Sequence, residues 1–192
     1  MNYRYRINYQ KNEGMRYTSN LDVHKMWERA FRRAKFPLVY SQGFHPQPKI
    51  QLASPLPLGF LSEYEIVDFI VDQEFDLETI RLTLTKSLPE GISVNSVLNL
   101  DLKEPALQTQ VIASDYHVFL LEEVNKKFIE QRIEIVMNAT SIPRTRRGKS
   151  YDLRPLIYEI NSVISDPFHL QMVLSSKDGA TGRPEEVLSE LE

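Results

Sequence analysis

The sequence of 192 residues contains no cysteine. This absence excludes disulfide bonds, zinc sites with thiolate ligands, iron–sulfur ligation and a cysteine nucleophile, because each of them needs a Cys side chain. We therefore expect this chain to hold no cofactor of its own. Chemistry of that kind would have to come from a partner protein.

Long apolar runs are also lacking. No segment approaches the roughly 18–20 consecutive apolar residues that a membrane-spanning helix requires. The first ten residues alternate polar and apolar side chains and contain no apolar core of a signal peptide. The sequence thus predicts a cytoplasmic protein with no membrane partner.

Recognisable catalytic and metal-binding motifs are absent as well. The four histidines show no ligand spacing such as His-x-x-x-His, so the sequence predicts no metal site. Ser41 lies outside any Gly-x-Ser-x-Gly elbow, and the chain has neither a phosphate-binding glycine loop nor a dinucleotide fingerprint. His45 is the catalytic candidate that remains.

The net charge of −3 conceals an uneven distribution of charge along the chain. Residues 1–50 contain ten Lys or Arg and three Asp or Glu, which gives +7. Residues 51–142 contain six Lys or Arg and fifteen Asp or Glu, which gives −9. Residues 143–192 contain seven Lys or Arg and eight Asp or Glu, which gives −1. A basic N-terminal third favours either an anion-binding face or an ordinary solvated surface.

Hydrophobic periodicity predicts an α+β protein whose first half follows the split βαβ, or ferredoxin-like, order. The expected elements are a strand over 3–9, a short strand over 15–18, a helix over 19–35, strands over 49–54 and 63–73 with a turn at 55–59, a helix over 76–88 and a strand over 92–100. This arrangement covers one face of an antiparallel sheet with helices.

The second half loosely repeats this pattern. Its expected elements are a strand over 111–122, a helix over 124–137, extended segments over 139–145, 150–160 and 167–174, and a short helix over 183–188. We therefore predict two ferredoxin-like units, residues 1–104 and residues 111–192, each with an antiparallel sheet covered by helices.

The predicted helix after Ser19 has two different faces. Its apolar face carries Val23, Trp27, Ala30, Phe31 and Ala34, and its basic face carries Lys25, Arg29, Arg32 and Arg33. An ordinary core helix would show the same pattern, with Glu28 and Arg32 paired at i,i+4. The alternative is an arginine-rich face whose guanidinium groups bind phosphates.

The segment from residue 41 to residue 49 combines glycine, two prolines, an aromatic residue and a histidine. Its candidate ligand-contacting residues are Ser41, Gln42, Gly43, His45 and Lys49. Their donors and acceptors suit recognition of an anion or a base. A structural crossover, in which His45 caps a backbone group, is the other interpretation.

A second basic cluster consists of Arg144, Arg146, Arg147 and Lys149, with Tyr151 close behind. Positive charge beside an aromatic ring is typical of a phosphate or RNA contact. A solvated hairpin tip would have the same composition. Asp152 and Arg154, which follow, share a strand face if the segment is extended.

Several segments of the chain are similar to the bacterial radical SAM-linked protein family. The similarity is carried by residues 18–50 (TSNLDVHKMWERAFRRAKFPLVYSQGFHPQPKI), 56–69 (LPLGFLSEYEIVDF), 144–157 (RTRRGKSYDLRPLI), 170–176 (LQMVLSS) and 183–188 (RPEEVL). Members of that family are often encoded beside, or fused to, a radical SAM protein and near ribosome- and RNA-processing genes. The resemblance thus implies a radical SAM protein as a partner, and an association with RNA or a ribosome-related component.

Two functional hypotheses follow. In the first, the chain is a noncatalytic RNA-binding or adaptor protein that uses the two basic clusters for phosphate and the 41–49 loop for recognition. In the second, it is an RNA-modifying or small-molecule enzyme with His45 as general acid or base and Asp22 or Asp152 assisting. The second hypothesis requires these side chains to meet in one pocket.

Overall fold

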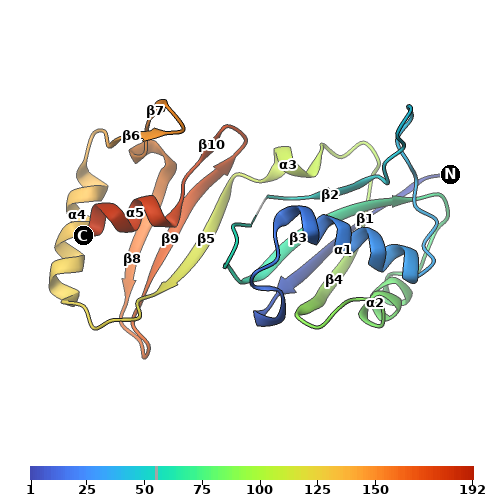
Figure 1. The fold of residues 1–192 in the computed structure, drawn as a ribbon, viewed down its shortest axis with the longest axis horizontal. Helices are drawn as coiled ribbons and strands as arrows, with labels where there is room; N and C mark the ends of the chain where they lie inside the picture. The colour runs from blue at the N-terminus through green and yellow to red at the C-terminus, as the bar shows by residue number, and fades with distance from the viewer. Residues whose placement is uncertain (55) are drawn as a thin grey trace. The chain divides into compact units, whose positions relative to one another are not determined.

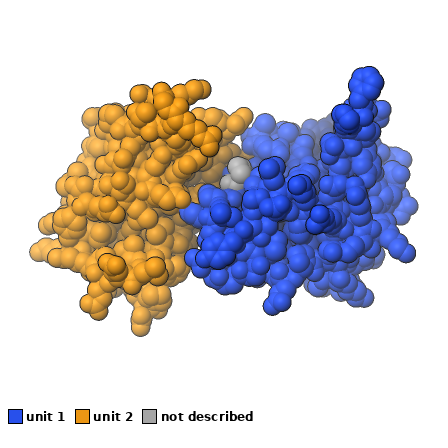
Figure 2. All heavy atoms as spheres, in the orientation of Figure 1, with its two compact units in different colours: residues 1–110 blue, residues 111–192 orange. Residues whose placement is uncertain are grey.

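A computed structural model describes residues 1–54 and 56–192, so Pro55 of the predicted 55–59 turn lies outside the described residues. The chain divides into two compact units, residues 1–110 and residues 111–192, which Figure 2 shows in separate colours. Helices and antiparallel sheets occur in both units, which confirms the predicted α+β class. No helix among the described residues has the length and apolar character needed to span a membrane.

The first unit has the predicted ferredoxin-like topology (Figure 1). Its elements are β1 (Tyr3–Lys11), the 3-10 helix η1 (Glu13–Met15), α1 (Asn20–Arg33), β2 (Ile50–Leu52), β3 (Ser62–Val71), α2 (Leu77–Thr85), β4 (Ile92–Leu100) and the short α3 (Leu107–Gln110). The strand order is β2-β3-β1-β4, and every neighbouring pair is antiparallel. The split βαβ arrangement places β3 between β1 and β2.

Aromatic side chains dominate the core of this unit. Alternate residues of β1 point to the helices, so Tyr5, Ile7 and Tyr9 are buried there. Trp27 and Phe31 come from the apolar face of α1, and they complete the cluster with side chains of α2 and β3. One side of the sheet is thus fixed as the core side, and α1 must turn its other face to solvent.

The predicted strand over residues 15–18 is wrong. Residues 13–15 form η1 instead, which leads into α1, where the Ser19 side chain accepts a hydrogen bond from Asp22 N at 3.2 Å. Alternation over only four residues is too short to define a strand, and the glycine at position 14 favours a turn.

The second unit contains a smaller version of the same arrangement. Its elements are β5 (Ala113–Phe119), α4 (Lys126–Asn138), β6 (Pro143–Arg146), β7 (Lys149–Asp152), the 3-10 helix η2 (Arg154–Leu156), β8 (Ile157–Val163), β9 (His169–Lys177), β10 (Ala180–Thr181) and α5 (Pro184–Leu191). β9 pairs antiparallel with both β5 and β8, and the short β10 pairs with its end. The described part of this unit contains no fourth long strand, so it has the split βαβ but not the complete ferredoxin-like sheet.

Candidate functional site

The solvent face of α1 carries a row of cations. Lys25, Arg29 and Arg33 follow one another at intervals of four residues and are exposed. Side chains at this spacing share one side of a helix and are separated by about 6 Å of helical rise. The structure thus places three of the four predicted basic residues of this helix along a single line.

A groove of about 370 Å³ lies along this row. Its lining comes from α1, from η1 and the residues after it, and from the turn before β4. The lining residues are Met15, Thr18, Asp22, Lys25, Met26, Arg29, Arg33 and Pro89. Apolar side chains therefore form part of the surface between the charged groups.

Close backbone packing holds η1 against the turn that precedes β4. Asn12 N donates a hydrogen bond to Gly91 O at 2.8 Å. Gly91 has a φ of +93°, and a Cβ at this position would lie 2.9 Å from Met15 N. A larger residue would therefore push Met15 and the rest of η1 away from the turn.

The groove has an excess of positive charge. Within the described part of the chain, no hydrogen bond or ion pair engages the side chains of Lys25 or Arg29. Arg33 donates to the backbone oxygen of Ser87 and keeps its full charge. Asp22 is the one carboxylate of the lining, and it accepts a hydrogen bond from the hydroxyl of Ser19 at 2.6 Å. Three cations thus face one carboxylate.

Arg32, the fourth basic residue predicted on this helix, is placed differently. Its guanidinium group pairs with Glu28 one turn earlier, as the i,i+4 spacing predicts, and it does not line the groove. Its charge is therefore partly neutralised within the helix.

The 41–49 segment forms a narrow loop whose base is braced by backbone contacts. Ser41 N donates to Gln47 O at 2.8 Å, and Gln47 N donates to the Ser41 hydroxyl at 2.9 Å. Lys49 N donates to Val39 O at 2.8 Å. Gln42, Gly43, His45 and Lys49 are exposed, and Ser41 is half-buried. Ser41 thus has a structural role, whereas the tip of the loop is open to solvent.

The second basic cluster lies on the β6–β7 hairpin, where α5 neutralises half of it. Arg144 pairs with Glu190, and Arg146 makes a bidentate contact with Glu186 while its guanidinium group lies 4.9 Å from the centre of the Tyr151 ring. Arg147 in the turn and Lys149 at the start of β7 are exposed and have no ion pair among the described residues. Arg144 and Arg146 therefore attach the hairpin to α5.

The Arg146–Glu186 contact makes the stability of the hairpin sensitive to acid. Burial raises the pKa of Glu186, but hydrogen bonds from Arg146 and Tyr151 lower it by more than burial raises it. The pKa therefore lies below its ordinary value of 4.5. A carboxylate with a depressed pKa stabilises the fold above its unfolded pKa, and this contribution is lost as the pH falls through the folded pKa. We expect wild type to be more stable than Glu186→Gln at neutral pH, and the difference to shrink as the pH falls below the ordinary glutamate pKa of 4.5 and through the lower folded pKa.

Urea denaturation followed by circular dichroism at several pH values measures this difference. A stability difference that stays constant between neutral and acidic pH would contradict the role of the Glu186 charge.

The residues of the predicted acid–base set have separate positions and tasks. His45 lies on the exposed loop that follows the C-terminal end of α1, whereas Asp22 lies in the first turn of that helix. Asp152 accepts hydrogen bonds from the backbone nitrogens of Ile142 and Arg154, which lower its pKa. Neither the groove along α1 nor the apolar pocket of the second unit is lined by His45 or Asp152. Among the described residues, these two cavities thus give His45 no carboxylate partner.

Two histidines outside these predictions contact each other. His117 Nδ1 and His169 Nε2 are 3.3 Å apart across β5 and β9, and their rings are stacked. Among the described residues, no group of three or more side chains is arranged as a metal site. The pair is therefore a surface contact between neighbouring strands.

A buried charge cluster on the first sheet was missed by sequence reasoning. Asp68 accepts hydrogen bonds from Arg4 and Arg6, and the guanidinium group of Arg4 also donates to the backbone oxygens of Glu104 and Pro105. Hydrogen bonding to Asp68 raises the pKa of Arg6. These arginines account for part of the N-terminal positive charge, and Arg4 holds residues 104–105 on the sheet.

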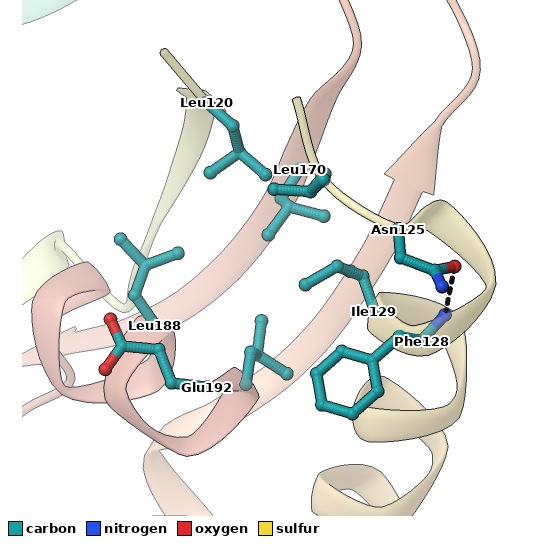
Figure 3. Close-up of a pocket in the computed structure, with 9 residues that line it drawn as sticks. Leu120, Asn125, Phe128, Ile129, Leu170, Leu188 and Glu192 are labelled. Atoms are coloured by element: carbon teal, nitrogen blue, oxygen red, sulfur yellow. Dashed lines mark hydrogen bonds between the residues drawn. The ribbon is translucent and has the colours of Figure 1, made fainter. Parts of the chain in front are cut away.

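The second unit has an apolar pocket of about 330 Å³ between α4 and α5. Figure 3 shows Phe128 and Ile129 of α4 and Leu188 of α5 facing the same hollow as Leu170. The Asn125 side-chain oxygen caps α4 by accepting a hydrogen bond from Phe128 N. Apart from Asn125 and Glu192, the lining residues are apolar and suit apolar contact.

These features define an α+β protein with a ferredoxin-like first unit that carries a cationic groove. The chain belongs to the bacterial family described as "Uncharacterized protein conserved in bacteria (DUF2344)", whose model matches residues 4–184. The matched range includes the groove, the 41–49 loop and the β6–β7 hairpin. No curated protein matches the chain.

Proposed function

We propose that the protein is a noncatalytic RNA-binding or adaptor protein that presents an RNA or ribosome-related substrate to a radical SAM partner. One observation carries the RNA-binding part of this proposal: the row of Lys25, Arg29 and Arg33 along an open groove on α1. A polyanion with regularly spaced phosphates is the natural ligand of such a row.

Structural roles account for only part of the positive charge on α1. Arg32 and Arg33 lie in the last turn of the helix, where cations interact favourably with the helix dipole. Lys25 and Arg29 lie earlier in the helix, where the dipole gives no such benefit. Phosphate binding explains why two exposed cations stand there without an ion-pair partner among the described residues.

The partner is inferred from the resemblance and from the composition of the chain. The similarity to radical SAM-linked proteins implies such a partner, and a chain without cysteine cannot ligate the iron–sulfur cluster through its own thiolates. In this proposal the chain recognises the RNA and the partner performs the radical chemistry. Isolation of the protein from its native host, with analysis of bound RNA and protein, tests the association.

Salt dependence tests the groove directly. We expect wild type to bind short single-stranded RNA at low salt, with an affinity that falls as salt rises. In Lys25→Gln/Arg29→Gln, the slope of log K against log [salt] should be shallower by about 1.4, since each phosphate contact on a single strand contributes about 0.7. Fluorescence anisotropy with labelled RNA over a salt series measures both slopes.

A matched control removes two charges elsewhere. Lys103 and Lys127 are exposed and lie outside the groove, so Lys103→Gln/Lys127→Gln should keep the wild-type slope. Equal slopes in the two double variants, or no RNA binding by wild type at low salt, would rule out the groove as the phosphate site.

A further inference from the structure

Phe44 is fully exposed at the tip of the 41–49 loop. The loop projects from the first unit as a narrow extension in Figure 1. Neighbouring Gly43 has a φ of +131°, and a Cβ at that position would meet no atom within 4 Å. The tip therefore does not pack against the described part of the chain, and both faces of the Phe44 ring are open to a ligand.

The base of the loop is rigid although its tip is free. Three hydrogen bonds close it. Ser41 N donates to Gln47 O and Lys49 N donates to Val39 O, which together form the bridge between Tyr40 and Pro48, and Gln47 N donates to the Ser41 hydroxyl. The two prolines at 46 and 48 restrict the backbone further. A preorganised loop loses little conformational freedom when its tip binds a ligand.

The sequence around the loop has a single sign of charge. Between Glu28 and Glu63 there is no Asp or Glu, whereas the same interval contains five cations: Arg29, Arg32, Arg33, Lys35 and Lys49. A partner that matches this segment is anionic and also offers a flat aromatic or apolar group to Phe44. Unpaired nucleotides combine these two properties, because each has a phosphate and a base with two open faces.

We propose that the 41–49 loop is a nucleotide-recognition element in which Phe44 stacks on an unpaired RNA base while the flanking cations contact adjacent phosphates. This inference rests on the proposed RNA-binding function and specifies its substrate class as RNA with a single-stranded loop, bulge or end. Bases within a duplex remain stacked on each other and leave no face for Phe44.

The test compares Phe44 variants on single-stranded RNA and on a blunt duplex. Phe44→Ala should weaken single-strand binding by roughly 5- to 100-fold, the range seen when a stacking aromatic is removed. Its affinity for the duplex and its salt slope should equal those of wild type, because no phosphate contact is lost. Phe44→Trp should retain single-strand binding, since the indole ring also stacks.

Phe44→Leu separates stacking from simple apolar contact. Leucine keeps an apolar side chain but has no aromatic face, so this variant should resemble Phe44→Ala. Wild-type affinity in Phe44→Leu or in Phe44→Ala would overturn the stacking proposal. If wild type binds no RNA at low salt, the proposed function itself fails, whereas RNA binding that is insensitive to position 44 rejects only the role of the loop.

Discussion

Asp68→Ala is expected to lower the free energy of unfolding of the first unit by about 3–5 kcal/mol, the usual effect of removing one partner from a buried ion pair. The Asp68 carboxylate accepts from Arg4 Nη2 at 2.6 Å and from Arg6 Nε at 2.7 Å, and its side chain is 3% exposed. Without it, two largely buried guanidinium groups lose their shared counterion. Trp27, the only tryptophan, lies in this unit, so its fluorescence in a urea titration follows the unit's unfolding.

Glu13→Ala is the matched control for Asp68→Ala. It removes a carboxylate that contacts Arg16 at 3.5 Å on the surface of the same unit. Because an exposed ion pair contributes about 1 kcal/mol or less, this variant should stay close to wild type. Similar urea midpoints for the two variants would show that Asp68 is not a buried counterion.

Phe69→Ala should also lower the stability of the first unit by about 3–5 kcal/mol, since it creates a large cavity in the core. The Phe69 ring is fully buried, with its centre 4.3 Å from that of Phe31, 5.6 Å from that of Tyr5 and 6.0 Å from that of Phe36. Trp27 fluorescence in urea again measures the change.

Leu21→Ala provides the surface comparison for Phe69→Ala. Leu21 is 73% exposed in the first turn of α1, so its truncation should change stability by only about 0.5 kcal/mol. A Phe69→Ala variant with the stability of Leu21→Ala would mean that the aromatic cluster is not closely packed.

Sequence reasoning succeeded where local signals determine the structure. The helix predicted from residue 19 begins there, with Ser19 as the cap of α1, and β4 covers the predicted residues 92–100. The order of elements in the first unit then follows from alternation and helical periodicity, which depend only on neighbouring residues. The ferredoxin-like topology was accessible because each of its elements has such a local pattern.

Long-range contacts explain what the sequence could not predict. Arg146 and Glu186 are separated by 40 positions, and the Arg4–Asp68 pair by 64, so no local pattern connects them. Residues 4 and 6 of a strand lie on the same face, so the two arginines could be placed together on β1 from the sequence. This spacing was the only local pattern that indicated the buried cluster. Only part of the groove could be predicted from the sequence. The cations of α1 were predicted, but the opposite wall of the groove near Gly91 was not.

The Arg4–Asp68 cluster also determines where the compact first unit ends. Arg4 binds the carbonyl oxygens of Glu104 and Pro105, and Leu107 is 1% exposed with its N–H donating to the Gln51 side chain. A fragment cut after β4 would leave the Arg4 guanidinium without these acceptors and would uncover the surface beneath Leu107. One that continues through Gln110 retains both, so the compact first unit extends beyond the last strand of its sheet.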